Sequence, residues 1–197
     1  QRSLVGSEMC IRDRTVGRDG VTIEAVTRQG LYWGRQTMGQ LAVSRRGRKC
    51  LPQCEITDWP AFRMRGFMHD TGRSFIPLDE LKHEIALLSS FKVNVFHWHL
   101  TENQAWRLES RHYPQLNAAQ NMLREQGRFY TLDEARELVN FCREHHVLLI
   151  PEIDMPGHSA AFERTFGFGM QTAEGKRIMK DIIAEAVSYT HLTLPTT

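Results

Sequence analysis

The 197-residue sequence has only four cysteines, Cys10, Cys50, Cys54 and Cys142, which are too few for a disulfide scaffold of this length. No run of apolar residues approaches the about 18–20 that a membrane-spanning helix needs. A formal net charge of +2 gives no general electrostatic reason to expect nucleic acid or an anionic membrane as a partner. With 41% hydrophobic and 24% charged residues, the composition indicates a globular protein and excludes disordered and collagen-like chains.

The two ends of the sequence differ from its middle in periodicity and charge. Residues 3–14 show no sustained period of 2 or 3.6, and residues 187–197 are uncharged although a charged helical pattern precedes them. Both ends resemble peptides that recur where adaptor sequence in shotgun assemblies is translated in frame. We therefore expect residues 1–14 and 187–197 to be artefacts, and we expect the chain to be a fragment.

The middle of the chain reads as alternating strands and helices. Alternation of apolar and polar residues at 21–26 predicts a half-buried strand, and a short helix is expected to begin near Trp33. The basic run at residues 45–49 has no accompanying aromatic platform, so a solvated turn is favoured there over a nucleic-acid site. Beyond Pro60, strand and helix patterns alternate at residues 64–68, 78–91, 93–99, 131 onward, 147–150 and 175–186.

This alternation predicts a parallel sheet with right-handed crossovers. The helix that begins at Thr131 opens with a capping box, in which Thr131 and Glu134 satisfy each other's free backbone amides. A doubly wound sheet and a (β/α)8 barrel both fit the pattern. Polar clusters follow each strand and no Gly-rich phosphate loop follows the first, which favours the barrel.

The first two strands end in side chains that bind polar ligands. Arg73 offers a planar fork of donors suited to vicinal hydroxyls or a carboxylate, and a structural pair with Asp70 is an equally good interpretation. His97 and His99 fall on one face of the second strand, where a further carboxylate or histidine could complete a zinc site. Simple packing inside a barrel is the favoured interpretation of these histidines.

The third strand ends in two carboxylates and a histidine within seven residues. Glu152 and Asp154 share a strand face, with backbone positions roughly 6.6–6.8 Å apart from the strand rise. That spacing is near the separation of the acid and base carboxylates in inverting glycosidases. Pro156 and Gly157 turn the chain and return His158 to the same rim. Because such groups are costly to bury without a partner or a reaction, function is favoured here over structure.

In chain order, these clusters resemble the family-20 glycoside hydrolases, the β-N-acetylhexosaminidases. The motifs are Arg65-Gly-Phe-Met-His-Asp-Thr-Gly-Arg73, Asn94-Val-Phe-His-Trp-His-Leu-Thr101 with Trp106-Arg107, and Pro151-Glu-Ile-Asp-Met-Pro-Gly-His158. The stretch from Gly30 to Pro60 is similar to the end of that family's small N-terminal α/β domain. The resemblance implies an α/β fold: residues 15–60 end the small domain and its linker. Residues 61–186 form about the first three βα units of a truncated TIM (β/α)8 barrel.

The resemblance also implies roles for single residues. Arg73 matches the arginine that binds sugar hydroxyls in the −1 subsite. Asp154 and His158 match residues that form a polar network around the catalytic acid. Glu102 stands where the family usually has Asp and would belong to the same supporting network.

The family's catalytic pair, an adjacent Asp-Glu in a Gly-Gly-Asp-Glu context, does not occur in this sequence. In the family, the Asp orients the substrate's 2-acetamido group, whose carbonyl oxygen attacks the anomeric carbon, and the Glu protonates the leaving oxygen. This substrate-assisted retaining route requires no metal and no cofactor. We therefore expect the complete enzyme to hydrolyse terminal non-reducing N-acetylhexosamine residues, and we expect this chain alone to be inactive.

The expected partner is a glycan or chitooligosaccharide with a terminal N-acetylhexosamine, and neither nucleic acid nor a membrane span is expected. Family habit suggests export from the cytoplasm. Two rival functions stay open at this point. The first is a zinc-dependent barrel hydrolase that uses His97 and His99, and the second is a non-catalytic carbohydrate-binding protein.

Overall fold

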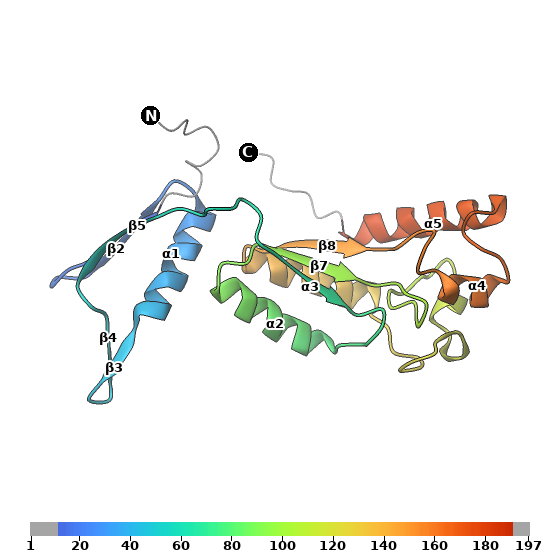
Figure 1. Cartoon of the computed structure of the whole chain (residues 1–197), viewed down its shortest axis with the longest axis horizontal. Helices are drawn as coiled ribbons and strands as arrows, with labels where there is room; N and C mark the ends of the chain where they lie inside the picture. The colour runs from blue at the N-terminus through green and yellow to red at the C-terminus, as the bar shows by residue number, and fades with distance from the viewer. Residues whose placement is uncertain (1–11, 191–197) are drawn as a thin grey trace. The chain divides into compact units, whose positions relative to one another are not determined.

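The computed structural model describes residues 12–190 of the chain, which divide into two compact units (Figure 1). The first unit comprises the chain up to Arg65 together with Leu88–Asn94. The second comprises Gly66–Leu87 and the chain from Val95 onward. No helix among the described residues combines the length and the apolar character that crossing a bilayer requires.

The first unit is built on an antiparallel sheet of three strands in the order β2-β1-β5. These strands are β1 (Arg12–Val16), β2 (Val21–Ala25) and β5 (Cys54–Asp58). Helix α1 (Arg28–Leu41) packs against β1 and β2 and buries Trp33. It begins earlier than the expected start near Trp33, because the Thr27 side chain caps it by accepting a hydrogen bond from the Gly30 amide at 3.0 Å.

Strand β1 begins inside the segment that we expected to lie outside the fold. Arg14 is 1% exposed and donates a hydrogen bond to the Asp58 carboxylate at 3.2 Å. The expected boundary at residue 14 therefore differs from the structure, which includes Arg12–Val16 in the sheet. Residues 1–11 and 191–197, which make up most of the two expected artefacts, lie outside the described residues.

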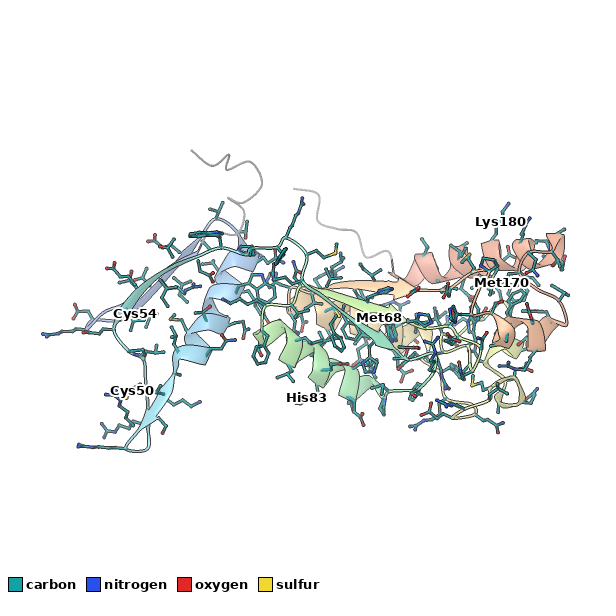
Figure 2. The ribbon with its side chains drawn as sticks, in the orientation of Figure 1. Cys50, Cys54, Met68, His83, Met170 and Lys180 are labelled. Atoms are coloured by element: carbon teal, nitrogen blue, oxygen red, sulfur yellow. The ribbon has the colours of Figure 1, made fainter. Side chains whose placement is uncertain are left out.

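The basic run, where the sequence predicts a solvated turn, contains an exposed turn between two short strands that the sequence analysis did not predict. Strands β3 (Val43–Arg45) and β4 (Arg48–Cys50) pair antiparallel around a two-residue turn. Both turn residues have positive φ, 50° at Arg46 and 74° at Gly47, which is the conformation that such tight hairpin turns require. Figure 2 shows Cys50 and Cys54 on neighbouring stretches of this unit, and both are free thiols.

The second unit contains a parallel sheet of three strands in the order β6-β7-β8. Strands β6 (Gly66–Asp70), β7 (Val95–His99) and β8 (Leu148–Glu152) are joined through helices, so their carboxyl ends meet at one edge. The helices of the unit are α3 (Leu132–Glu144), α4 (Ala160–Phe166), α5 (Ala173–Thr190) and most of α2 (Leu78–Ser90), whose residues from Leu88 onward belong to the first unit. Short 3₁₀ turns lie at Pro114–Asn117 and Ala119–Asn121.

Local sequence signals explain the main elements of this unit. The capping box at α3 is confirmed, since the Glu134 amide donates to Thr131 Oγ1 at 3.1 Å and the Thr131 amide donates to Glu134 Oε2 at 2.8 Å. The buried face of α3 then packs toward β8, with Leu138 fully buried. Helix α5 continues to Thr190, four residues beyond the boundary expected at 186.

Candidate functional site

The candidate site lies at the carboxyl ends of β6, β7 and β8. The strand register aligns Asp70 with His99 and His99 with Glu152, so that one side chain from each strand reaches this edge. Parallel sheets position binding groups in this way, because the loops that leave the strands all begin on the same side.

Arg73 lies in the loop that leaves β6 and pairs with Asp70. The Asp70 carboxylate accepts a hydrogen bond from the Arg73 backbone amide at 3.0 Å and another from its guanidinium. Burial alone would raise the pKa of Asp70, but the hydrogen bonds from Arg73, together with the charge interactions with His99 and Arg73, lower the pKa below its ordinary value. The Arg73 side chain is still 45% exposed, so the structural pair leaves donors accessible to a ligand.

Glu102 is the buried centre of the cluster. Although only 1% exposed, its carboxylate accepts hydrogen bonds from the Arg73 guanidinium and the Asn103 amide, and Oε1 also contacts Nδ1 of His158. The Arg73 guanidinium lies 3.4 Å from the same His158 nitrogen. A buried carboxylate is costly unless it is paired, and the three contacts supply that pairing.

His158 reaches this cluster from the turn that follows β8. Its backbone is in the left-handed region at φ 49°, which costs a non-glycine residue about 1–2 kcal/mol. Strained residues of this kind persist where surrounding contacts hold them, and they concentrate at functional sites. The contact with Glu102 is such a restraint on the His158 side chain.

A second group, formed by His97, His99 and Glu152, lies on strands β7 and β8 themselves. Glu152 Oε2 lies 2.6 Å from Nε2 of His97 and 3.1 Å from Nδ1 of His99, so one carboxylate oxygen serves both histidines. Strand periodicity had predicted that His97 and His99 share a face. The opposite face of β7 carries Trp98, which is buried edge-on against Tyr130 at a ring-centroid distance of 4.7 Å.

This second group is the part of the described chain that could hold a metal ion. Ligand atoms of His99, Glu152 and Asp154 all lie within 4.8 Å of one another. The zinc alternative required a carboxylate to join the strand histidines, and Glu152 supplies one. In the structure, both histidines make direct contacts with this carboxylate.

The structure distributes the predicted site residues over the two groups. Arg73, Glu102 and His158 form one cluster, whereas Asp154 belongs with His99 and Glu152 and donates its backbone amide to Thr101 Oγ1 at 2.9 Å. The His99 and His158 rings join the groups, since their centroids lie 6.4 Å apart in an edge-on arrangement.

Sequence reasoning offered Asp70 as a structural partner of Arg73 and named Glu152 as a carboxylate of the third strand, but it committed neither to a functional role. Asp70 anchors Arg73, and Glu152 connects His97 with His99. The parallel register explains why they meet at one edge, since it places Asp70, His99 and Glu152 in one row. The functional roles assigned to Arg73, Glu102, Asp154 and His158 stay predictions.

Known proteins are similar to this chain in both sequence and fold. The family described as "Glycosyl hydrolase family 20, catalytic domain" matches residues 62–190, and "Glycosyl hydrolase family 20, domain 2" matches residues 15–59. A β-hexosaminidase of Porphyromonas gingivalis is 39% identical over 154 residues, which cover 72% of this chain and 20% of that protein.

Solved structures agree with the sequence matches. The β-N-acetylhexosaminidase of Bacteroides fragilis superposes with a TM-score of 0.84 at 27% identity, over 95% of this chain and 42% of that one. An exo-β-N-acetylglucosaminidase of Vibrio harveyi, solved with N-acetylglucosamine, gives a TM-score of 0.80 at 26% identity, over 91% of this chain and 34% of that one. The chain therefore spans less than half the length of these proteins.

Proposed function

This chain belongs to glycoside hydrolase family 20, and from this premise we propose that it forms the N-terminal part of a β-N-acetylhexosaminidase. The complete enzyme would hydrolyse terminal non-reducing N-acetylhexosamine residues from glycans or chitooligosaccharides. The observation that carries the proposal is the cluster of Arg73, Glu102 and His158 at the carboxyl ends of the strands. Barrel enzymes carry out their chemistry at this end.

The parallel strands β6, β7 and β8 would be the first three strands of a (β/α)8 barrel. Strand β8 is an edge of the sheet within residues 12–190, and Leu148 and Ile150 on it are 51% and 37% exposed. Beside this edge lies an apolar hollow of about 250 Å³. Its lining residues are Trp98, Leu100, Leu108, Ala135, Pro151, Ile153, Met155, Ile183, Ala186 and Val187. Exposed apolar surface next to an unpaired strand supports a fold that continues with further βα units.

A second apolar hollow supports the same continuation. It has a volume of about 430 Å³ and lies along α5, where Figure 2 labels Met170 and Lys180. Met155 and Ile183 line both hollows, and they are 42% and 38% exposed. Later helices and strands of the complete enzyme would cover this surface.

Within the proposed site, the residues of this chain bind and orient rather than break the bond. The Arg73 guanidinium would donate to two hydroxyls of the terminal sugar. Glu102, Asp154 and His158 would support the catalytic acid, which the remainder of the enzyme contributes with its neighbouring Asp. The substrate's acetamido oxygen would serve as the nucleophile, so the chain needs no nucleophile of its own. Export from the cytoplasm is part of the proposal and rests on family habit alone.

A zinc-dependent hydrolase is the second candidate, because His99, Glu152 and Asp154 converge within 4.8 Å. One experiment separates the two. The full-length enzyme is assayed with a chromogenic N-acetylglucosaminide before and after dialysis against a strong chelator, and its metal content is measured. We expect turnover that the chelator does not change. Loss of turnover together with zinc would support the metal candidate. Absence of turnover would contradict the proposed hexosaminidase, and absence of both turnover and bound zinc would favour a binding protein.

The chain studied by itself supplies a complementary test. It lacks a Gly-Gly-Asp-Glu motif, so we expect no turnover from it under conditions in which the full-length enzyme is active. Measurable turnover by the purified chain would contradict the proposed division of roles.

A further inference from the structure

The loop that carries Arg73 is fixed at both of its ends. At its start, the backbone amides of Thr71 and Gly72 both donate to the His99 carbonyl, at 3.0 and 3.1 Å, and the Thr71 hydroxyl donates to the same oxygen at 2.8 Å. At its end, the Phe75 amide donates to Oε2 of Glu125 at 2.6 Å. Arg73 lies between these two attachments, so the position of its guanidinium depends on both.

Glu125 belongs to a different loop, the long connection that follows β7, and Arg107 holds it in place. The Arg107 side chain is fully buried, and its two terminal nitrogens are paired while Nε has no hydrogen-bond partner among the described residues. Its Nη2 donates to Glu125 Oε2 at 3.0 Å and its Nη1 to the Glu125 carbonyl at 3.1 Å. The Arg107 guanidinium also donates hydrogen bonds to the backbone carbonyls of Arg124 and Arg128, so it contacts the turn at several points.

The backbone of Glu125 has a strained conformation that its contacts with neighbouring residues stabilise. Its φ of 46° lies in the left-handed region, which costs a non-glycine residue about 1–2 kcal/mol. Residues keep such a conformation only where the surrounding contacts over-determine it. At Glu125, the bonds from Arg107 and Phe75 do so, and they use the side chain and the backbone together.

Aromatic contacts reinforce the same junction. The Phe75 ring stacks on Tyr130 at a centroid distance of 4.7 Å, and the Arg128 guanidinium lies over the Phe75 ring, with its Cζ atom 4.9 Å from the ring centroid. The Tyr130 hydroxyl donates to the Ile76 carbonyl at 2.6 Å. Burial raises the pKa of Tyr130 to about 12, so this hydroxyl remains a donor throughout the neutral range.

Resting on the proposed function, we propose that Glu125 is a positioning residue for sugar recognition. Its carboxylate joins the loop after β7 to the loop after β6 and thereby sets where Arg73 presents its guanidinium. Glu125 itself touches no sugar. Its influence passes through the Phe75 amide, two residues along the chain from Arg73.

The test compares two carboxylates that both accept a backbone amide. Glu125→Ala removes the bond to Phe75 together with the side-chain bond from Arg107. Glu109→Ala removes a bond of 2.8 Å from the Leu132 amide to Glu109 Oε2, which involves no residue of the Arg73 loop. Kinetics of the full-length variants are measured well below their Tm. We expect Glu125→Ala to lower kcat/KM by about ten- to a hundred-fold, mainly through KM, because small misplacements of binding groups have effects of this size.

We expect Glu125→Gln to restore part of the loss, because the amide oxygen can still accept from Phe75. Glu109→Ala should lower the Tm and leave KM unchanged. Equal kinetic effects of Glu125→Ala and Glu109→Ala would overturn the proposal. The same outcome would follow if Glu125→Gln were as impaired as Glu125→Ala.

Hydrogen exchange separates the proposal from the proposed function. In the absence of sugar, peptides that cover residues 71–77 should lose protection in Glu125→Ala and keep it in Glu109→Ala. Unchanged protection in Glu125→Ala would overturn the positioning role whatever the enzyme hydrolyses. Lost protection in an enzyme without hexosaminidase turnover would contradict only the proposed function.

Discussion

Replacing Gly72 with alanine should displace Arg73 without altering any charged group. A Cβ atom at position 72 would lie 2.9 Å from Cβ of Glu102, 3.2 Å from its backbone nitrogen and 3.2 Å from the Thr101 carbonyl carbon. Two of these three atoms belong to the backbone, and the third belongs to the Glu102 side chain, which is buried and hydrogen-bonded and so has little room to move. The added methyl group therefore has to move the loop after β6 rather than its neighbours.

The required movement can be taken from the same distances. Ordinary contacts of a Cβ begin at 3.4 Å, so Cβ of residue 72 must move at least 0.5 Å from Cβ of Glu102. A misplacement of 1 Å can cost about a hundred-fold in rate, so half that distance predicts a loss of about tenfold in kcat/KM. Overpacking of this kind also destabilises a protein by about 1–3 kcal/mol.

The assay compares kcat/KM and Tm of the full-length wild type, Gly72→Ala and Gly39→Ala. Gly39 is an exposed residue inside α1 with no atom within 4 Å of an added Cβ, so alanine there should raise stability by up to about 1 kcal/mol and leave kcat/KM unchanged. Wild-type kcat/KM in Gly72→Ala would refute the reasoning, because it would mean that the loop absorbs the methyl group without moving Arg73.

Three further predictions concern single interactions in the full-length enzyme. Arg73→Lys keeps the charge but loses the planar fork, so kcat/KM should fall by about ten- to a hundred-fold, and an unchanged value would leave Arg73 with a structural role only. Because Glu102 and His158 touch, the combined Glu102→Gln and His158→Ala variant should lose less kcat than the product of the single losses, and fully multiplicative losses would contradict one shared network. Burial, with a smaller contribution from His145, holds the pKa of His146 below 6.5, so the unfolded chain binds a proton first and stability falls as pH drops below 6.5. His146→Gly removes this group and suits the backbone φ of 54°, so its Tm should fall less between pH 7.5 and 5.5 than that of the wild type, and parallel Tm curves would contradict this account.

Signals between near neighbours in sequence determined most of the elements. The capping box at Thr131 and the strand at residues 21–26 are patterns of a few residues, and the structure has both. Strand periodicity also placed His97 and His99 on one face of β7, since alternation follows from the backbone itself. The ordered motifs identified the family, and the family comparisons confirmed it.

Contacts between residues far apart in sequence could not be predicted in this way. Strand β5 escaped the sequence analysis because Cys54–Asp58 gains its conformation by pairing with β1, about 40 residues earlier. Within the site, the motif around Asp154 and His158 suggested one network of neighbours. In the structure, His158 contacts Glu102 while Asp154 lies beside His99 and Glu152, and the expected network around the catalytic acid stays a prediction.

The attachment of the Arg73 loop shows most clearly what tertiary structure alone decided. Nothing in the residues around Glu125 indicates a site, because its neighbours form an irregular polar connection. Its role arises from a fully buried Arg107 and from the Phe75 amide, which lies 50 residues away in sequence. Hydrogen-bond partners of this kind depend on where the loops meet in space, and sequence patterns of short range carry no information about that meeting.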